Sequence, residues 1–112
     1  MAIENWSENI AVARVADDPQ FEEDMESLTT ALQDRWYDVV VDFSQVTRLN
    51  SSNIGSLLRL RKRMIDLERH LILCGVSTKV WGTFIVTGLD KIFQFSDDVA
   101  TALATLHMGK VG

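Results

Sequence analysis

The chain alternates between short continuous apolar runs and longer stretches in which apolar residues recur every three or four positions. The strongest run, Val39–Val41, is β-branched and is followed by Asp42 and Phe43. A short run of this kind, flanked by polar residues, is typical of a strand buried on both faces of a parallel sheet. Runs at Ile10–Val15 and Leu71–Val76 predict two more strands, and weaker runs at Ala2–Trp6 and Ile92–Phe95 predict two short ones.

Four stretches have the spacing of amphipathic helices, and each follows a predicted strand. The first starts at Pro19 and runs to about Asp34, with Asp17 or Asp18 as its expected cap. The second starts near Ser52, and we expect its buried stripe to contain Ile54, Leu57, Leu58, Met64 and Ile65. The other two follow the third strand and the last short strand.

The resulting order, β-β-α-β-α-β-α-β-α, predicts a mixed, mostly parallel sheet with helices packed against it. At 112 residues and 46% apolar composition, the sequence predicts one globular domain spanning residues 1–112. The single cysteine, Cys74, lies inside a predicted strand, so we expect it to be buried and unreactive.

Charge and motifs exclude several classes of function. A net charge of −5 disfavours nucleic-acid binding, although Arg59, Arg61, Lys62 and Arg63 form a local basic cluster that is either solvated or meets an acidic partner. The two histidines and the cysteine show no metal-ligand spacing, and there is no phosphate-binding glycine loop or hydrolase serine motif, so we expect no metal, no cofactor and no enzymatic activity. Without a signal peptide or a membrane-length apolar run, a cytoplasmic location and no membrane insertion are expected.

A pair of serines remains as the candidate for function. Ser51 and Ser52 follow a polar loop and stand where the second helix begins, and at least one of Asn50, Ser51 and Ser52 should cap that helix. The first helical turn also tolerates added negative charge, because its free N–H groups and the helix dipole are positive there. A phosphorylated serine at this position would change the surface charge without unfolding the domain.

The same residues resemble a known family. The segment DFSQVTRLNSSNIG is similar to the DxSxVxxxDSSGLG signature of STAS domains, above all of bacterial anti-sigma factor antagonists. The segments LTTAL and ILCGVSTKVWGTFIVTGLDKIFQF continue the resemblance, which covers about residues 8–106.

The resemblance implies a partner-switching regulator. In that family the antagonist binds an anti-sigma factor that is also a serine kinase of the histidine-kinase-like ATPase type. Phosphorylation of the second motif serine ends binding, and a phosphatase restores it. That serine corresponds to Ser52, with Ser51 as second choice. The expected contact residues in and beside the loop Val46–Asn53 are Arg48, Asn50, Ser51, Ser52, Asn53, Arg59 and Lys62.

Two positions depart from the family pattern. Asn50 replaces the usual aspartate and removes a charge, and Asn53 replaces the usual glycine and adds a side chain. These departures leave open a STAS interaction module without phosphorylation control, such as an accessory subunit of a transport ATPase or a scaffold in a sensory assembly. A small enzyme or nucleotide-binding protein with its site near Ser52 is a third hypothesis.

Overall fold

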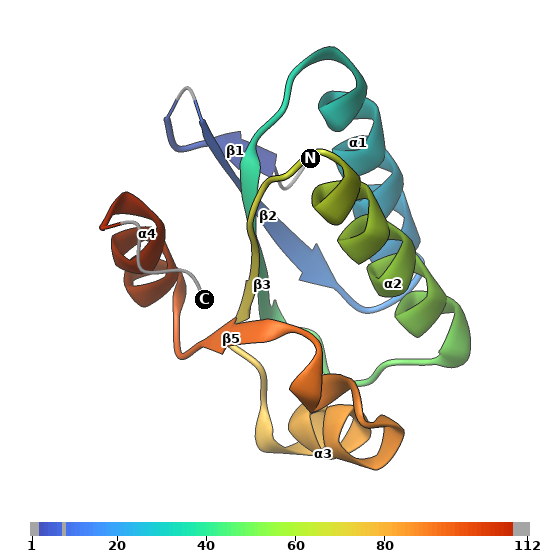
Figure 1. Ribbon diagram of the computed structural model, residues 1–112. Helices are drawn as coiled ribbons and strands as arrows, with labels where there is room; N and C mark the ends of the chain where they lie inside the picture. Colours follow the sequence, from blue (N-terminus) through green and yellow to red (C-terminus); the bar gives the residue numbers. More distant parts are fainter. Residues whose placement is uncertain (1–2, 8, 109–112) are drawn as a thin grey trace.

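A computed structural model describes residues 3–7 and 9–108 and contains a five-stranded sheet in the order β1-β2-β3-β4-β5 (Figure 1). The first strand is antiparallel to the second, and the other three strand pairs are parallel. This confirms the predicted mixed, mostly parallel sheet. The strands are β1 (Ile3–Asn5), β2 (Ile10–Ala16), β3 (Asp38–Gln45), β4 (Leu71–Cys74) and β5 (Gln94–Ser96).

The helices divide unequally between the two faces of the sheet. Helices α1, α2 and α3 share the larger core on one face, and α4 covers part of the other (Figure 1). A short 3-10 turn, η1 (Leu89–Lys91), separates α3 from β5. The α-helices are α1 (Gln20–Asp34), α2 (Ser51–Asp66), α3 (Thr78–Thr87) and α4 (Val99–His107).

Strand β3 supplies side chains to both cores, as its sequence predicts. Val39, Val41 and Phe43 are fully buried under α1, α2 and α3. Val40 points to the opposite face and packs with Ile72 of β4 beneath α4. Because successive strand residues alternate between faces, an unbroken apolar run is the pattern of a strand covered on both sides.

The predicted buried stripe of α2 is partly wrong. Leu57 and Met64 are buried as expected, but Leu58 is 38% exposed and Ile65 is 55% exposed. The side of the helix that packs inward includes two polar residues instead, Asn53 and Ser56. Hydrophobic spacing alone misplaces this stripe, because it cannot show that Asn53 and Ser56 are buried. Their polar groups are satisfied by hydrogen bonds to Glu22 of α1.

The predicted cap of α1 is also wrong. Neither Asp17 nor Asp18 caps this helix, whose N-cap position is Pro19, and no side chain makes a capping hydrogen bond there. The two carboxylates turn away from their own helix. They bond instead to the loop between β3 and α2, which contains the candidate serines.

The carboxyl end of β4 carries the buried thiol of Cys74, as predicted. Burial, together with the nearby carboxylates of Asp42 and Asp98, raises the pKa of this thiol to about 12, so it stays protonated and unreactive. The next residue, Gly75, has φ +68°, and a Cβ built on it would lie 2.7 Å from Asp42 Oδ1. The strand therefore ends in a turn that only glycine fits.

Candidate functional site

The N-terminus of α2 is closed by two asparagines. The side-chain oxygen of Asn50 accepts the backbone N–H of Asn53 at 2.8 Å, and Asn53 Oδ1 accepts the backbone N–H of Asn50 at 3.1 Å. This reciprocal pair is a capping box built from asparagines. The expectation that at least one of residues 50–52 caps the helix is confirmed, and the capping residue is Asn50.

The two serines that follow have no structural partner. Both Ser51 and Ser52 are exposed, and their hydroxyls make no hydrogen bond with any of the described residues. By contrast, the hydroxyl of Ser77 caps α3 by accepting the N–H of Val80 at 3.3 Å. Because Asn50 closes α2, the hydroxyls of Ser51 and Ser52 are free to react or to bind.

The two asparagines that cap α2 are also held by acidic residues at the start of α1. Asp18 Oδ2 accepts Nδ2 of Asn50 at 2.8 Å and Nδ2 of Asn53 at 3.1 Å. Nδ2 of Asn53 also reaches Oε2 of Glu22 at 2.7 Å. Asn50 is uncharged, but its hydrogen bond places the carboxylate of Asp18 directly beside it. The side chain that Asn53 adds is 3% exposed and fully engaged, so it rigidifies this turn.

Asp17 fixes the preceding part of the same loop. Its carboxylate accepts the backbone N–H groups of Thr47 at 2.8 Å and Arg48 at 3.3 Å, and it also accepts the Thr47 hydroxyl. The hydroxyl and N–H of Thr47 lower the pKa of the Asp17 carboxyl, since they stabilise its charged form. The dipeptide Asp17-Asp18 therefore holds the loop at both ends, just before the serines.

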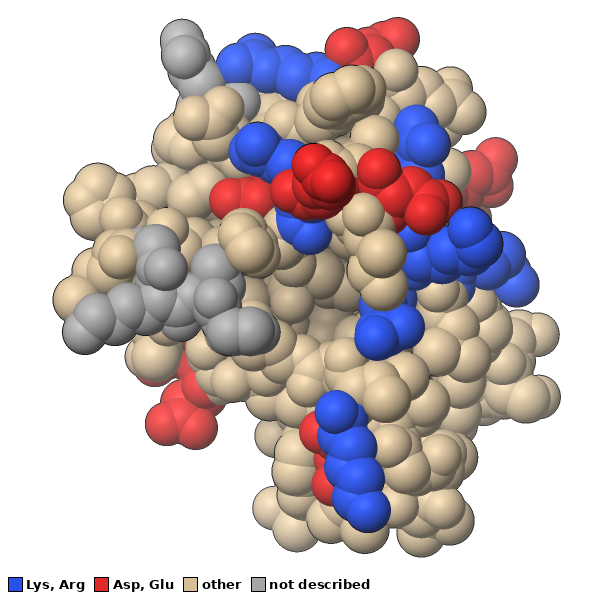
Figure 2. Space-filling model, in the orientation of Figure 1, with Lys and Arg blue, Asp and Glu red and all other residues tan. Residues whose placement is uncertain are grey.

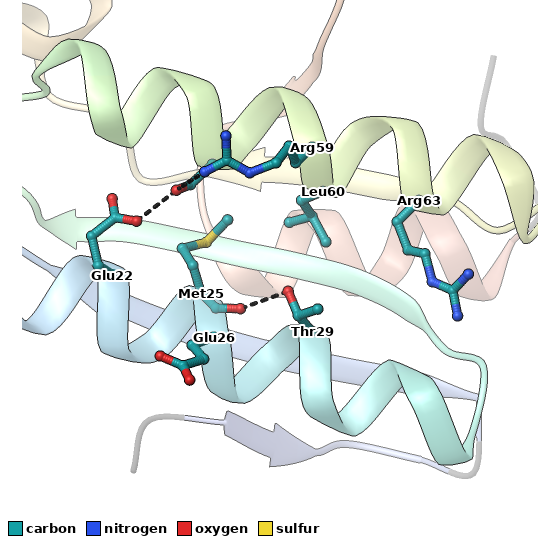
Figure 3. A pocket seen from close by; sticks show the side chains of 8 residues that line it. Glu22, Met25, Glu26, Thr29, Arg59, Leu60 and Arg63 are labelled. Atoms are coloured by element: carbon teal, nitrogen blue, oxygen red, sulfur yellow. Dashed lines mark hydrogen bonds between the residues drawn. The ribbon is translucent and has the colours of Figure 1, made fainter.

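A chain of side-chain bonds continues along the inner side of α2 (Figure 3). The Ser56 hydroxyl donates to Oε1 of Glu22 at 2.6 Å, and Nη2 of Arg59 donates to Ser56 Oγ at 3.1 Å. These residues form one end of a groove of about 380 Å³ between α1 and α2. Its other lining residues are Met25, Glu26, Thr29, Leu60 and Arg63.

The two serines begin different faces of α2. At 100° per residue, Ser52 falls within a sector of about 60° that also contains Ser56, Arg59 and Arg63. Ser51 begins a second sector, about 120° away, that contains Leu58, Lys62 and Ile65. The first sector faces the groove. The second is exposed, and Lys62 is paired with Asp66 at 3.2 Å within it.

The structure brings together most of the residues expected to form the site. Arg48, Asn50, Ser51 and Ser52 lie exposed on one loop and helix start, whereas Asn53 is buried. The sequence reasoning missed Asp18, Glu22 and Ser56 as members of this cluster. The position of Asp18 just after β2 could have indicated its role. The carboxyl ends of neighbouring parallel strands lie at the same edge of a sheet, so residues that follow β2 lie near the loop that follows β3.

The basic cluster on α2 is divided rather than continuous. Arg59 turns toward the groove, and Nε of Arg61 donates to the backbone oxygen of Ile92 at 3.2 Å. Figure 2 shows basic and acidic side chains interspersed over the side of the molecule that carries α2.

Within residues 3–7 and 9–108, no group of three His, Cys, Asp or Glu side chains is arranged to hold a metal ion. Over the same residues, none of the helices combines the length and the apolar character needed to cross a lipid bilayer.

Comparison with known proteins gives a family and a shared fold. A family model described as STAS domain matches residues 16–102. The anti-sigma factor antagonist SpoIIAA in its unphosphorylated form aligns with TM-score 0.79 and 19% identity over 98% of this chain and 97% of that chain. An anti-sigma-factor antagonist (STAS) domain protein from Planctomyces limnophilus aligns with TM-score 0.80 and 21% identity, over 94% and 97%. A sulfate transporter family protein from Wolinella succinogenes aligns with TM-score 0.75 and 16% identity, over 88% and 85%.

Proposed function

Because this chain belongs to the STAS domain family, we propose that it acts as an anti-sigma factor antagonist in a partner-switching pathway. The observation that carries the proposal is the hydroxyl of Ser52, which is exposed at the first turn of α2 and has no hydrogen-bond partner among the described residues. Ser52 is the proposed phosphorylation site, and Ser51 is the second choice. The resemblance of NSSN to the family motif supports this assignment.

The proposed partner is an anti-sigma factor that is also a serine kinase of the histidine-kinase-like ATPase type. The unmodified antagonist binds this partner in the cytoplasm and prevents it from binding a sigma factor. A phosphatase removes the phosphate and returns the antagonist to its binding form. No residue of the chain is assigned a catalytic role in this cycle.

The proposed contact surface is the exposed part of the loop and the beginning of α2. It comprises Arg48, Asn50, Ser51 and Ser52, with Arg59 and Lys62 further along the helix. Asn53 takes a different role from the one expected of it, because its side chain is 3% exposed and is held by Asp18 and Glu22. It positions the turn instead of contacting the partner.

The mechanism is a change of charge on a surface that keeps its shape. The asparagine capping box and the Asp17-Asp18 contacts fix the loop without using either serine hydroxyl. Phosphorylation adds about −1.5 to −2 charges to a surface that was complementary to the partner. Like-charge repulsion of several kcal/mol would lower the affinity more than a hundredfold.

The proposal is tested with the cognate kinase and the variant Ser52→Ala. This variant should keep partner binding, measured by calorimetry, and should lose phosphorylation, measured by mass spectrometry of the intact protein. Ser51→Ala is the matched control, because it removes the neighbouring hydroxyl and leaves Ser52 in place. Full-stoichiometry phosphorylation of Ser52→Ala would exclude Ser52 as the acceptor.

A second candidate function is a STAS module without phosphorylation control. The structural likeness to the sulfate transporter family protein, with TM-score 0.75, is the observation in its favour. In that case the chain is an accessory subunit of a transport ATPase or a scaffold in a sensory assembly. Affinity capture from the source cell separates the two, since recovery of a histidine-kinase-like ATPase supports the antagonist role and recovery of a transport ATPase subunit contradicts it.

A further inference from the structure

We propose that Arg59 binds the phosphoryl group when Ser52 is phosphorylated, so that the chain itself holds the modified side chain. The inference rests on the proposed function, because it concerns the same serine. Arg59 would then take part in both states of the protein, on the partner surface before phosphorylation and bonded to the phosphoserine after it.

The position of the Arg59 guanidinium is the main evidence. Although Arg59 is exposed, its guanidinium folds back toward the N-terminus of α2, where Nη2 donates to Ser56 Oγ at 3.1 Å. A Cβ built on Gly55 would lie 3.3 Å from Nη1 of the same guanidinium. Gly55 and Ser56 are the i+3 and i+4 neighbours of Ser52, which are the positions adjacent to a residue on a helix surface. The guanidinium therefore lies one helical turn from the Ser52 side chain.

Arg59 is also free to change its partner. It makes no ion pair with any of the described residues, and its hydrogen bond to Ser56 joins a charged donor to a neutral hydroxyl. Ser56 does not depend on this bond, because its hydroxyl still donates to Glu22 at 2.6 Å. The groove beside it, of about 380 Å³, leaves room for the guanidinium to move (Figure 3). A phosphate dianion offers a stronger, bidentate acceptor than a serine hydroxyl.

The charges around Ser52 favour Arg59 as the partner. The carboxylates of Asp18 and Glu22 lie on the α1 side and repel a phosphate, and both already accept the Asn53 amide. Arg63 lies on the same sector of α2, but it is eleven residues from Ser52, or about 16 Å along the helix axis. Of the charged residues in this sector, Arg59 is the cation within reach.

The two serines are not equivalent in this respect. The guanidinium of Arg59 bonds to Ser56, which is the i+4 neighbour of Ser52 and, at 100° per residue, lies about 140° around the helix from Ser51. Ser51 begins the exposed sector that leads to Leu58 and Lys62, about 120° away. We therefore expect Arg59 to hold a phosphate on Ser52 more strongly than one on Ser51. Capture of the phosphate also withdraws a positive charge from the partner surface, so one modification adds negative charge and removes positive charge from the same contact.

The test uses protein with phosphoserine installed at position 52 during translation, which requires no kinase. The second pKa of the phosphate, ordinarily about 6, is measured by phosphorus NMR across a pH titration. We expect the value to be lower by about half a pH unit than in the Arg59→Gln variant, because a nearby guanidinium favours the dianion. The matched control Arg63→Gln removes a charge from the same groove and should leave the phosphate pKa unchanged.

Three results contradict the inference. They are equal phosphate pKa values with and without Arg59, an equal effect of Arg63→Gln, or an equal Arg59 effect when phosphoserine is placed at position 51. Circular dichroism confirms that each variant is folded. Because the phosphate is installed synthetically, a negative result here says nothing against kinase action on Ser52. Conversely, absence of phosphate from protein isolated from its own cells would contradict the proposed function and leave the Arg59 contact measurable.

Discussion

Two loops at the carboxyl edge of the sheet lead from a parallel strand into a helix, and they are held in place by different means. The side chain that fixes the loop between β4 and α3 is local, since the hydroxyl of Ser77 caps α3. The backbone of this loop turns at Gly75, which has positive φ and whose N–H donates to the backbone oxygen of Asp97. The loop between β3 and α2 is fixed from outside, by Asp17 and Asp18 at the end of β2. In the first loop the hydroxyl of Ser77 makes the capping hydrogen bond. In the second loop the hydroxyls of Ser51 and Ser52 make no hydrogen bond with the described residues.

The difference indicates how the proposed modification site would lie on a rigid turn. Phosphorylation of a serine that caps its helix would turn the capping hydroxyl oxygen into a phosphate ester, so modification and capping would act on the same atom. In the β3–α2 loop the capping residue is Asn50, and Asp18 accepts a hydrogen bond from the side chain of Asn50. The hydroxyls of Ser51 and Ser52 are therefore not needed to cap the helix. Four predictions, from the largest expected effect to the smallest, test this contrast.

The first prediction disrupts the locally fixed loop. Gly75→Ala should lower the free energy of unfolding by about 3 kcal/mol, because alanine is strained at positive φ and its Cβ would overlap Asp42. Chemical denaturation measures the loss. Gly82→Ala is the matched control in the adjoining helix, where a Cβ meets nothing within 4 Å. It should raise stability by up to about 1 kcal/mol. Equal effects of the two substitutions would contradict the steric account of Gly75.

The second prediction disrupts the externally held loop. Asn53→Gly restores the glycine of the family motif, yet it should destabilise this protein by about 2 kcal/mol, measured by the same method. The substitution removes half of the capping box and the amide that Asp18 and Glu22 share. A neutral or stabilising result would show that the hydrogen bonds of Asn53 do not stabilise the turn, and that asparagine is merely tolerated at this position of the family motif.

As part of the second prediction, a paired exchange separates the effect of charge from the effect of geometry in the Asn50–Asp18 contact. Asn50→Asp alone should destabilise the fold, since its carboxylate would face Asp18 where the Asn50 amide now donates at 2.8 Å. The double variant Asn50→Asp with Asp18→Asn exchanges the amide and the carboxylate and should recover most of the loss. Failure of the double variant to exceed Asn50→Asp in stability would show that the two side chains are not coupled.

The third prediction compares the serines directly. Ser77→Ala should cost about 1 kcal/mol in unfolding free energy, because it removes the α3 cap. Ser52→Ala should change stability by no more than about 0.5 kcal/mol, since its hydroxyl bonds to none of the described residues. If the two costs are equal, the serines of α2 are structural after all, and the main argument for Ser52 as a modification site fails.

The sequence predicts the fold better than it predicts the site, for a physical reason. Strand and helix order follow from apolar spacing, and the continuous run Val39–Val41 correctly indicates a strand covered on both faces. Apolar spacing says nothing about which polar residues meet across the fold. Asn53 and Ser56 occupy the inner side of α2 because Asp18 and Glu22 face them, 31 to 35 residues away in sequence. Contacts of this kind come from topology, so Ile65 was wrongly placed in the core and Asp18 wrongly expected to cap its own helix.

The fourth prediction, with the smallest effect, is a pH dependence of the externally held loop. Hydrogen bonds from Thr47 lower the pKa of Asp17 below its ordinary value of 3.8, so the folded state favours the charged carboxylate. Its stabilising contribution is therefore present above that ordinary value and is lost as the pH falls through the folded-state pKa. Wild type should exceed Asp17→Asn in stability near pH 6, and the difference should shrink toward about pH 2. Asp98, whose pKa is also lowered, titrates in both proteins, so its effect cancels in the difference. Thr47→Val removes the hydroxyl that contributes most to the shift, and in that background the pH dependence of the difference should weaken. A difference that stays constant from pH 6 to pH 2 would mean that Asp17 holds the loop by geometry alone, independent of its charge.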